Sequence, residues 1–464
     1  MSLTERLRTF HGSMQPTDVG ISGPTSLDMA RGFLSIRADP LTFLGEVSAR
    51  YGDLVSFPVP GAPAILVNDP AAARHVLQTA ARTWTKDTVQ YAALARVTGP
   101  GLLASAEPSW IEHRRLAAPA FHHQRLAAVG DQVREAARSA VHARLRSLAP
   151  NGEVVDVAEL THAVGLDAVG RALFSADLSD QAGRLLSATA DAADLVVRLG
   201  RSVLPRAGWT PTRTNLRLRS ARHRLDTATD EIVSQRRARH RSAAHHGDDL
   251  LGILLDSGLD DTAVRNELVT MIIAGHETVA AALAWTLMLL AEHPDMQDHV
   301  RTELADLTNP VSLVAPRDSV PWTRAVVDEA LRLYPPAWAI SRRASGPDVI
   351  SGHEVPAGTL AIISPWLIHR HRDTWDAPEQ FRPQRFLDNA SVRGAYLPFG
   401  HGPRLCIGRD FALGEMVILL DEMLRQHRVS LPPAWTRPVP RAQVAVHPAG
   451  GMPLLVSPLD RQSR

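Results

Sequence analysis

Several features that often indicate a function are scarce in this sequence. A single cysteine among 464 residues excludes an intramolecular disulfide. The formal net charge of +1 gives no global indication of binding to nucleic acid or to a membrane surface. Lys86 is the only lysine, and we interpret the many arginines as the codon bias of a GC-rich genome.

Long hydrophobic runs are also absent. The longest mostly apolar run, residues 279–291, is too short to span a bilayer and has Glu277 and Glu292 at its two sides. Residues 1–20 carry early charges and resemble neither a signal peptide nor a membrane anchor. With 45% hydrophobic and 21% charged residues, the composition is typical of a globular protein with a large core. We therefore expect a soluble, cytoplasmic protein.

The order of sequence patterns predicts a mainly α fold with a smaller β-rich part. Residues 51–59 and 64–68 read as a hairpin, and helical periodicity then dominates residues 71–329. After Pro335, proline and glycine recur between short β-like runs. No internal repeat or long linker divides the chain, so we expect one domain over residues 1–464, with an irregular segment over residues 1–25.

The lone cysteine has a specific local context. Out of context, a buried inert thiol would be the better interpretation of Cys406. Glycines surround it, however, and a helical pattern that begins near Phe411 follows it. A helix N-terminus favours the thiolate form of cysteine. The segment reads Phe399-Gly400-His401-Gly402-Pro403-Arg404-Leu405-Cys406-Ile407-Gly408.

This segment resembles the haem-binding loop of the cytochrome P450 family at six fixed positions, a match expected by chance on the order of once in 100,000 chains. The resemblance implies the P450 fold, with haem between a distal helix and the cysteine loop, and Cys406 as the iron ligand. It implies that Arg404 pairs with a haem propionate, and that glycines leave room for the macrocycle. The matched positions are Phe399, Gly400, Gly402, Arg404, Cys406 and Gly408.

A second segment, Ala274-Gly275-His276-Glu277-Thr278, lies within a helical pattern over residues 261–293. Alone it would read as an ordinary helix, but beside the Cys406 loop it matches the distal-helix signature of the family. The match places Ala274 and Gly275 against the cofactor. It assigns oxygen and proton organisation to Thr278 and proton delivery through water to Glu277. We expect no role for His276.

A third pattern, Glu329 and Arg332 at a spacing of three, places both side chains on one helix face. The simpler interpretation is a surface ion pair of little consequence. The family resemblance instead implies a buried network that these residues form with Arg385, holding the cysteine loop under the haem.

Further residues are assigned to the haem propionates by resemblance. Trp110 and Arg114 match a Trp-x-x-x-Arg element, whose spacing puts both on one side of a helix. Arg342 is preferred to Arg343 on the predicted strand. His369 also matches a position near a propionate.

The positions expected to line the substrate pocket are mostly apolar, which favours an apolar substrate. We predict oxidation of a specialised metabolite such as a terpenoid, or of a fatty acid. The predicted pocket residues are Ile272, Ile273, Ala337, Trp338, Ile340 and Met452.

The resemblance also implies cofactors and partners. They are haem b, dioxygen as co-substrate, and electrons from NAD(P)H that arrive through separate proteins, a ferredoxin with its reductase or a flavodoxin. We expect an acidic partner to dock near Arg114, Arg115, His401, Arg404 and Arg409. No nucleic acid or membrane partner is expected.

Three alternatives remain open at this point. One is a haem-thiolate isomerase or peroxide-dependent enzyme, against which Glu277 and Thr278 argue. Another is a haem protein that binds a ligand without turnover. The third is a haem-free enzyme with Cys406 as nucleophile, for which only His401 offers a nearby base.

Overall fold

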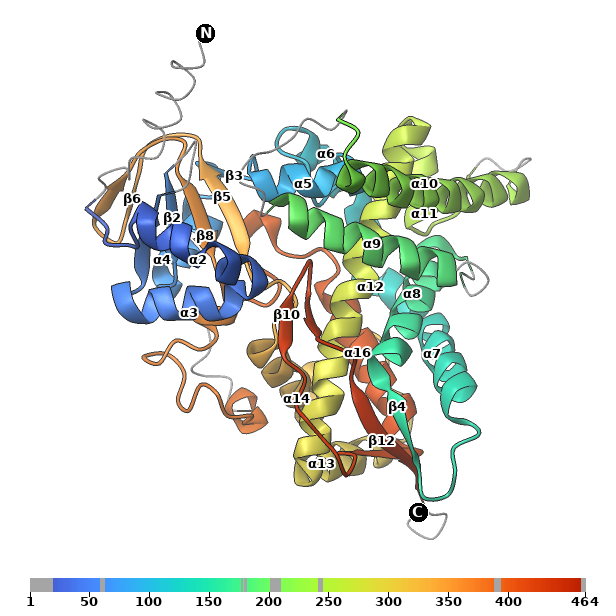
Figure 1. Ribbon diagram of the computed structural model, residues 1–464. Helices are drawn as coiled ribbons and strands as arrows, with labels where there is room; N and C mark the ends of the chain where they lie inside the picture. Colours follow the sequence, from blue (N-terminus) through green and yellow to red (C-terminus); the bar gives the residue numbers. More distant parts are fainter. Residues whose placement is uncertain are drawn as a thin grey trace.

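The computed structural model describes residues 20–58, 63–176, 178, 182–200, 210–240, 245–387 and 394–459. Helices make up most of this part of the chain, as Figure 1 shows, so the predicted mainly α fold class is confirmed. The helices are α2 (Ser26–Ala38), α3 (Pro40–Tyr51), α4 (Pro70–Arg74), α5 (Val89–Thr98), α6 (Ser109–Ala117), α7 (His123–Leu145), α8 (Val157–Phe174), α9 (Ala182–Gly200), α10 (Arg213–Arg239), α11 (Leu250–Asp256), α12 (Asp261–Glu292), α13 (Pro294–Ala305), α14 (Pro321–Leu333), α15 (Pro365–Ile368) and α16 (Arg409–Leu424).

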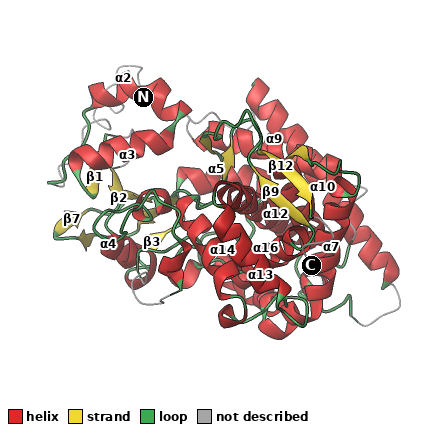
Figure 2. Ribbon diagram, turned by 90° about the horizontal axis from the view of Figure 1, so that it is seen from below, coloured by secondary structure: helices red, strands yellow, loops and turns green. Residues whose placement is uncertain are grey.

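Short strands form the smaller β part. The largest sheet has the order β1-β2-β8-β5-β3, and the predicted hairpin is its β1–β2 edge. Figure 2 shows how little of the molecule the strands occupy. The strands are β1 (Leu54–Phe57), β2 (Ala64–Val67), β3 (Trp84–Thr85), β4 (Glu153–Asp156), β5 (Ile340–Ala344), β6 (Asp348–Ile350), β7 (His353–Val355), β8 (Leu360–Ile363), β9 (His427–Ser430), β10 (Pro440–Ala442), β11 (Val446–Pro448) and β12 (Pro453–Pro458).

Helix α12 runs through the middle of the helical part (Figure 1). Asp260 caps its first turn by accepting the backbone N–H of Ala263. Among the described residues it is the one helix long and apolar enough to cross a membrane, but 83% of its most apolar window is buried inside the protein. That burial is typical of the core helix of a globular protein.

Close packing between α12 and α8 depends on two glycines. A Cβ at Gly275 would lie 2.8 Å from Val169 Cγ2, and one at Gly165 would lie 3.1 Å from the His276 carbonyl oxygen. Helix α12 stays α-helical through Gly275. Its glycine therefore serves the helix–helix contact.

Three histidines gather where α12, α8 and β11 meet. The ring centroid of His162 is 5.5 Å from that of His276 and 5.6 Å from that of His447. Burial lowers all three pKa values, that of His276 to about 3 and that of His447 to about 4. The three rings are therefore neutral at neutral pH.

This cluster predicts acid sensitivity. Because the folded state disfavours protonated His447, its contribution to stability is present above the unfolded-state pKa of about 6.5 and is lost as pH falls toward 4. The expected loss is roughly 2–3 kcal/mol for His447. Thermal unfolding of His447→Gln and of the unsubstituted protein between pH 7 and pH 4 tests this. Parallel pH dependences of the two proteins would contradict it.

Candidate functional site

The Cys406 loop is fixed by its own backbone. The Cys406 N–H donates to the Phe399 carbonyl at 3.0 Å, and the Leu405 N–H donates to the Gly402 carbonyl at 3.0 Å. Gly402 has a φ of +69°, and a Cβ on it would lie 2.1 Å from the Leu77 carbonyl oxygen. Gly402 is therefore required by contact with the π-helical turn His75–Thr79, whereas the sequence suggested room for a macrocycle.

The Cys406 side chain is accessible, yet burial among protein atoms raises the pKa of its thiol. A sulfur that is both accessible and surrounded by protein atoms is one that faces a hollow inside the protein. The backbone N–H of Gly408 and the cations Arg114 and Arg409 oppose the rise. The expected preference for thiolate is thus outweighed by burial, and a bound metal ion would be needed to deprotonate the sulfur fully.

Four cations from four separate parts of the chain lie near Cys406 or near one another. Lys86, Arg342 and Arg404 influence one another's charge, as do Arg114 and Arg404. Burial and Arg342 lower the pKa of Arg404 to about 10, and burial lowers that of Lys86 well below its usual value. Among the described residues, the one carboxylate within ion-pair distance of these four is Glu107, 3.9 Å from Arg404. Buried cations in such excess fit an anionic ligand with two carboxylates.

Two of the predicted propionate residues are held by backbone carbonyls of the site. Arg114 Nη1 donates to the Leu405 carbonyl at 2.9 Å, and Arg404 Nη1 donates to the Ser105 carbonyl at 2.9 Å. The Arg404 guanidinium also lies 3.8 Å from the centroid of the buried Trp110 ring. Arg404 of the cysteine loop is therefore a neighbour of Trp110 and Arg114, which come from the separate Trp-x-x-x-Arg element.

The position of Lys86 beside the site was not predicted from the sequence. Its ammonium donates to the Leu103 carbonyl at 2.9 Å and lies 4.4 Å from the Tyr91 ring centroid. Only 8% of its surface is exposed, and a buried lysine without a carboxylate partner is unusual. The signal was present, because this is the only lysine of an arginine-rich chain.

The structure separates Arg342 from Arg343. Arg342 is 4% exposed, and its Nη1 donates to the Ser341 carbonyl at 2.8 Å within reach of the cation cluster. Arg343 instead donates to the backbone carbonyls of Asp87 and Gly358 at the sheet surface. Arg342 therefore lies with the cation cluster and Arg343 lies outside it.

Helix α12 presents one accessible stripe in its buried middle. Ala274, Gly275 and Thr278 keep accessible surface, whereas the residues on either side of them are buried. The Thr278 hydroxyl donates to the Ala274 carbonyl at 2.8 Å, so its lone pairs remain free to accept a hydrogen bond. These three residues are thus the part of the middle of α12 that the surrounding described residues leave uncovered.

Glu277 lies beside this stripe and is 4% exposed. Its Oε2 has no hydrogen-bond partner among the described residues. Burial raises its pKa to about 8, so the carboxyl is mostly protonated at neutral pH. Glu277 can therefore hold and release a proton at neutral pH.

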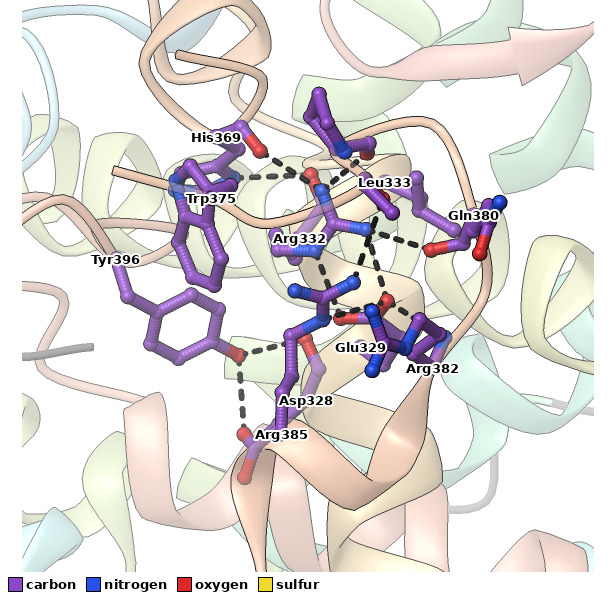
Figure 3. A network of polar contacts seen from close by, with 12 residues as sticks. Asp328, Glu329, Arg332, Leu333, His369, Trp375, Gln380, Arg382, Arg385 and Tyr396 are labelled. Carbon is purple, nitrogen blue, oxygen red and sulfur yellow. Dashed lines mark hydrogen bonds and ion pairs between the residues drawn. The ribbon is translucent and has the colours of Figure 1, made fainter. Parts of the chain in front are cut away.

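The structure brings Glu329, Arg332 and Arg385 together, as Figure 3 shows. Arg332 Nε donates to Glu329 Oε2 at 2.7 Å, and Arg385 Nε donates to Glu329 Oε1 at 3.2 Å. All five N–H donors of Arg332 are used, because it also donates to Glu329 Oε1 and to the carbonyls of His369, Pro378 and Gln380. Glu329 and Arg332 are completely buried.

His369 does not join the cation cluster. Its Nδ1 is 3.1 Å from the Arg332 carbonyl oxygen, and its Nε2 accepts the Leu397 N–H at 2.9 Å. Burial and Arg332 lower its pKa to about 3. Because both ring nitrogens bond the backbone, His369 positions the chain before the cysteine loop, and the expected propionate contact is wrong.

Three predicted pocket residues belong to the packed core. Ile272, Ile273 and Met452 are at most 2% exposed, so they border no hollow that could hold a substrate. Met452 is fixed between β4 and β12, and its N–H donates to Asp156 Oδ1 at 2.9 Å.

The other three predicted residues remain candidates for lining a substrate pocket. Ala337 and Trp338 are half-buried, and Ile340 is 9% exposed. Trp338 Nε1 donates to the Gln443 carbonyl at 2.9 Å, which joins this segment to the turn between β10 and β11. The sequence did not single out this turn as a neighbour of Trp338.

The predicted basic docking cluster divides into two groups. Arg114 and Arg404 are half-buried beside the hollow, whereas Arg115 and Arg409 are exposed. Arg409 pairs with its neighbour Asp410 at 2.8 Å, which offsets part of its charge. Arg115 lines a surface hollow together with Arg125 and His122, so further basic side chains lie beside it.

Comparisons with known proteins agree with this site. The family model described as "Cytochrome P450" matches residues 23–454. Over 434 residues the chain is 32% identical to cyclooctat-9-en-7-ol 5-monooxygenase of Streptomyces melanosporofaciens, covering 90% of each chain. It is 32% identical to pentalenene oxygenase of Streptomyces avermitilis, covering 94% of this chain and 96% of that protein. It is also similar to the crystal structure of CYP175A1 from Thermus thermophilus, with a TM-score of 0.74, 32% identity and coverage of 93% and 98%.

These matches define the class of protein, a family that implies a haem held by a cysteine thiolate, and Cys406 is the single cysteine of this chain. The chain belongs to the cytochrome P450 family and is a P450 monooxygenase.

The residues present fit the cofactor that the family implies. Cys406 offers an accessible sulfur ligand, the nearby cations can supply charge for two propionates, and Ala274, Gly275 and Thr278 keep accessible surface on α12.

Proposed function

We propose that this chain inserts one oxygen atom from dioxygen into an apolar small molecule, with electrons supplied by separate redox proteins. The haem, held by Cys406, supplies oxygen activation when bound. Arg114, Arg342, Arg404 and Lys86 would hold its propionates. The observation that carries the proposal is that Glu277 is buried, with Oε2 unpartnered among the described residues, beside the accessible Thr278 on α12.

Each of the two α12 side chains has a distinct task. Cleavage of dioxygen to water requires two protons in a site that otherwise excludes solvent. Glu277 holds a proton at neutral pH because of its burial. Thr278 donates its own proton to the Ala274 carbonyl, so its oxygen can accept and fix a proton-bearing group or water. This pair favours oxygen insertion over the isomerase, peroxide-dependent and ligand-binding alternatives, none of which needs it.

An apolar substrate is supported by the wall of the pocket. Ala337, Trp338 and Ile340 are apolar, and the polar edge of Trp338 is already bonded to Gln443. The names of two relatives specify cyclooctat-9-en-7-ol and pentalenene. We propose a terpenoid, with a fatty acid as the second candidate.

The test is turnover of the purified holoprotein under isotope-labelled dioxygen, with a ferredoxin, its reductase and NAD(P)H. Panels of cyclic terpenes and fatty acids are first screened by the shift of the haem absorption on binding. We expect a product that carries one labelled oxygen atom. Product without the label, or product that forms with peroxide and not with dioxygen, would favour the alternatives.

We further propose that the chain acts as a single cytoplasmic unit and that an acidic ferredoxin or flavodoxin docks over Arg115. Because Arg115 is exposed, reversing its charge should slow association and weaken its dependence on salt. We expect Arg115→Glu to lower the rate of first electron transfer about tenfold at low salt. Arg31→Glu, on the exposed α2, is the matched control. Equal rates for both variants, measured by stopped flow, would exclude this docking face.

A further inference from the structure

Tyr396 occupies an unusual place for a tyrosine. It lies ten residues before Cys406, and its phenol oxygen is 3.0 Å from Asp328 Oδ1 and 3.1 Å from the Asp328 carbonyl oxygen. Burial raises its pKa well above the usual value, so the phenol is protonated at neutral pH. The hydroxyl therefore donates to a carboxylate of α14, as Figure 3 shows.

Aromatic rings surround Tyr396. Its ring centroid is 5.0 Å from that of Phe386, 5.5 Å from that of His369 and 6.5 Å from that of Trp375. His369 in turn accepts the backbone N–H of Leu397 in the segment that leads to Cys406. The cluster thus lies against the loop that holds the thiol.

Charge distinguishes the two oxidisable rings of this cluster. The guanidiniums of Arg332 and Arg385 lie 5.1 and 5.9 Å from the Trp375 ring centroid. Two nearby cations disfavour a positive charge on the indole. Tyr396 avoids that penalty, because it can lose a proton together with an electron and remain neutral.

Asp328 is arranged to take that proton. Its side chain is 4% exposed, Oδ1 accepts the phenol, and Oδ2 accepts Arg317 Nη1 at 2.6 Å. Arg317 is 31% exposed and also donates to the Phe386 carbonyl at 2.7 Å. The carboxylate is therefore fixed, with one oxygen held by the cation and the other directed at the phenol.

We propose that Tyr396 is a one-electron relay that protects the haem site when dioxygen or peroxide reacts there without substrate. The proposal rests on the proposed haem-thiolate function. Tyr396 gives one electron to the oxidised site, and its phenolic proton moves to Asp328 Oδ1. The neutral phenoxyl radical that remains regains an electron from the reduced redox partner, or from ascorbate, and the proton returns from Asp328.

The electrons balance with hydrogen peroxide as the oxidant. Reduction of one peroxide to two waters takes two electrons and two protons. Tyr396 supplies one electron, and ascorbate supplies the other. A second ascorbate electron then restores the tyrosine, so the net reaction consumes peroxide and ascorbate and leaves the protein unchanged.

The test uses purified holoprotein without substrate, mixed with hydrogen peroxide and freeze-quenched for electron paramagnetic resonance. The chain has only four tyrosines, so each can be replaced in turn. We expect a tyrosyl signal in the unsubstituted protein, its loss in Tyr396→Phe, and faster haem bleaching in that variant. Tyr334→Phe, a buried tyrosine stacked on Trp285, is the matched control and should keep the signal.

The carbon monoxide spectrum of each variant is recorded first, so that failure of the haem site itself is recognised separately. Should Tyr396→Phe not hold haem, mass spectrometry of the peroxide-treated unsubstituted protein locates the oxidised residue, which we expect to be Tyr396. A signal that persists in Tyr396→Phe, or oxidation found only at other residues, would overturn the proposal. The Tyr396–Asp328 bond would then be structural alone.

Discussion

Replacing Glu329 with alanine is expected to give protein that is insoluble or free of haem. The substitution leaves the guanidiniums of Arg332 and Arg385 without their carboxylate, and Arg332 is completely buried. It also removes the acceptor of the Arg382 backbone N–H. Breaking a buried pair in this way costs about 3–5 kcal/mol. A loss of that size is a large part of the stability of a typical domain.

The effect should be specific to the buried position. Glu379 is the matched control, because it lies on the neighbouring segment, is itself 71% exposed and makes one ion pair, with Arg370 at 3.2 Å. We expect Glu379→Ala to change the free energy of unfolding by less than about 1 kcal/mol. Haem content, solubility and thermal unfolding of the two variants decide the matter. Normal haem content in Glu329→Ala would show that the network does not hold the cysteine loop.

Replacing Glu277 with glutamine should lower the rate of product formation without destabilising the fold. The amide keeps the shape of the side chain but cannot deliver a proton, so we expect product formation to fall about 100-fold. Dioxygen consumed without product should then appear as peroxide. Glu277→Asp retains a carboxyl group and should keep most of the activity.

Glu277→Gln should also be more stable than the unsubstituted protein at pH 8. The pKa of folded Glu277 is about 8, above its unfolded value near 4.5, so the glutamate disfavours the folded state as pH rises between these values. Glutamine lacks this dependence. We expect the difference in the free energy of unfolding to grow from pH 5 to pH 8 and to reach a few kcal/mol. A glutamine variant with full activity, or with no gain in stability at pH 8, would contradict the role and burial given to Glu277.

Local patterns were sufficient to predict elements that a single segment encodes. The helical stretch around Glu277 and the helix that carries Glu329 and Arg332 are encoded by periodicity within the segment itself. The Cys406 loop was recognisable because its glycines and arginine stand at fixed spacings. These predictions needed no knowledge of tertiary contacts.

The residues that were missed or misplaced depend on contacts between distant segments. Met452 was expected in the pocket, but pairing of β12 with β4 turns it into the core. Lys86 joins the cation cluster only because β3, β5 and the cysteine loop converge. His369 was assigned to a propionate, yet its two ring nitrogens meet backbone groups 37 and 28 residues away. Periodicity carries no information about such pairings.

The most direct test of the central claim is the absorption spectrum of the purified holoprotein, reduced with dithionite and exposed to carbon monoxide. With the Cys406 thiolate on the haem iron, we predict a Soret band at about 450 nm, and its loss in Cys406→Ser. A stable band at about 420 nm in fresh protein, or no Soret band after expression with ample haem, would contradict the assignment of Cys406 as the haem ligand.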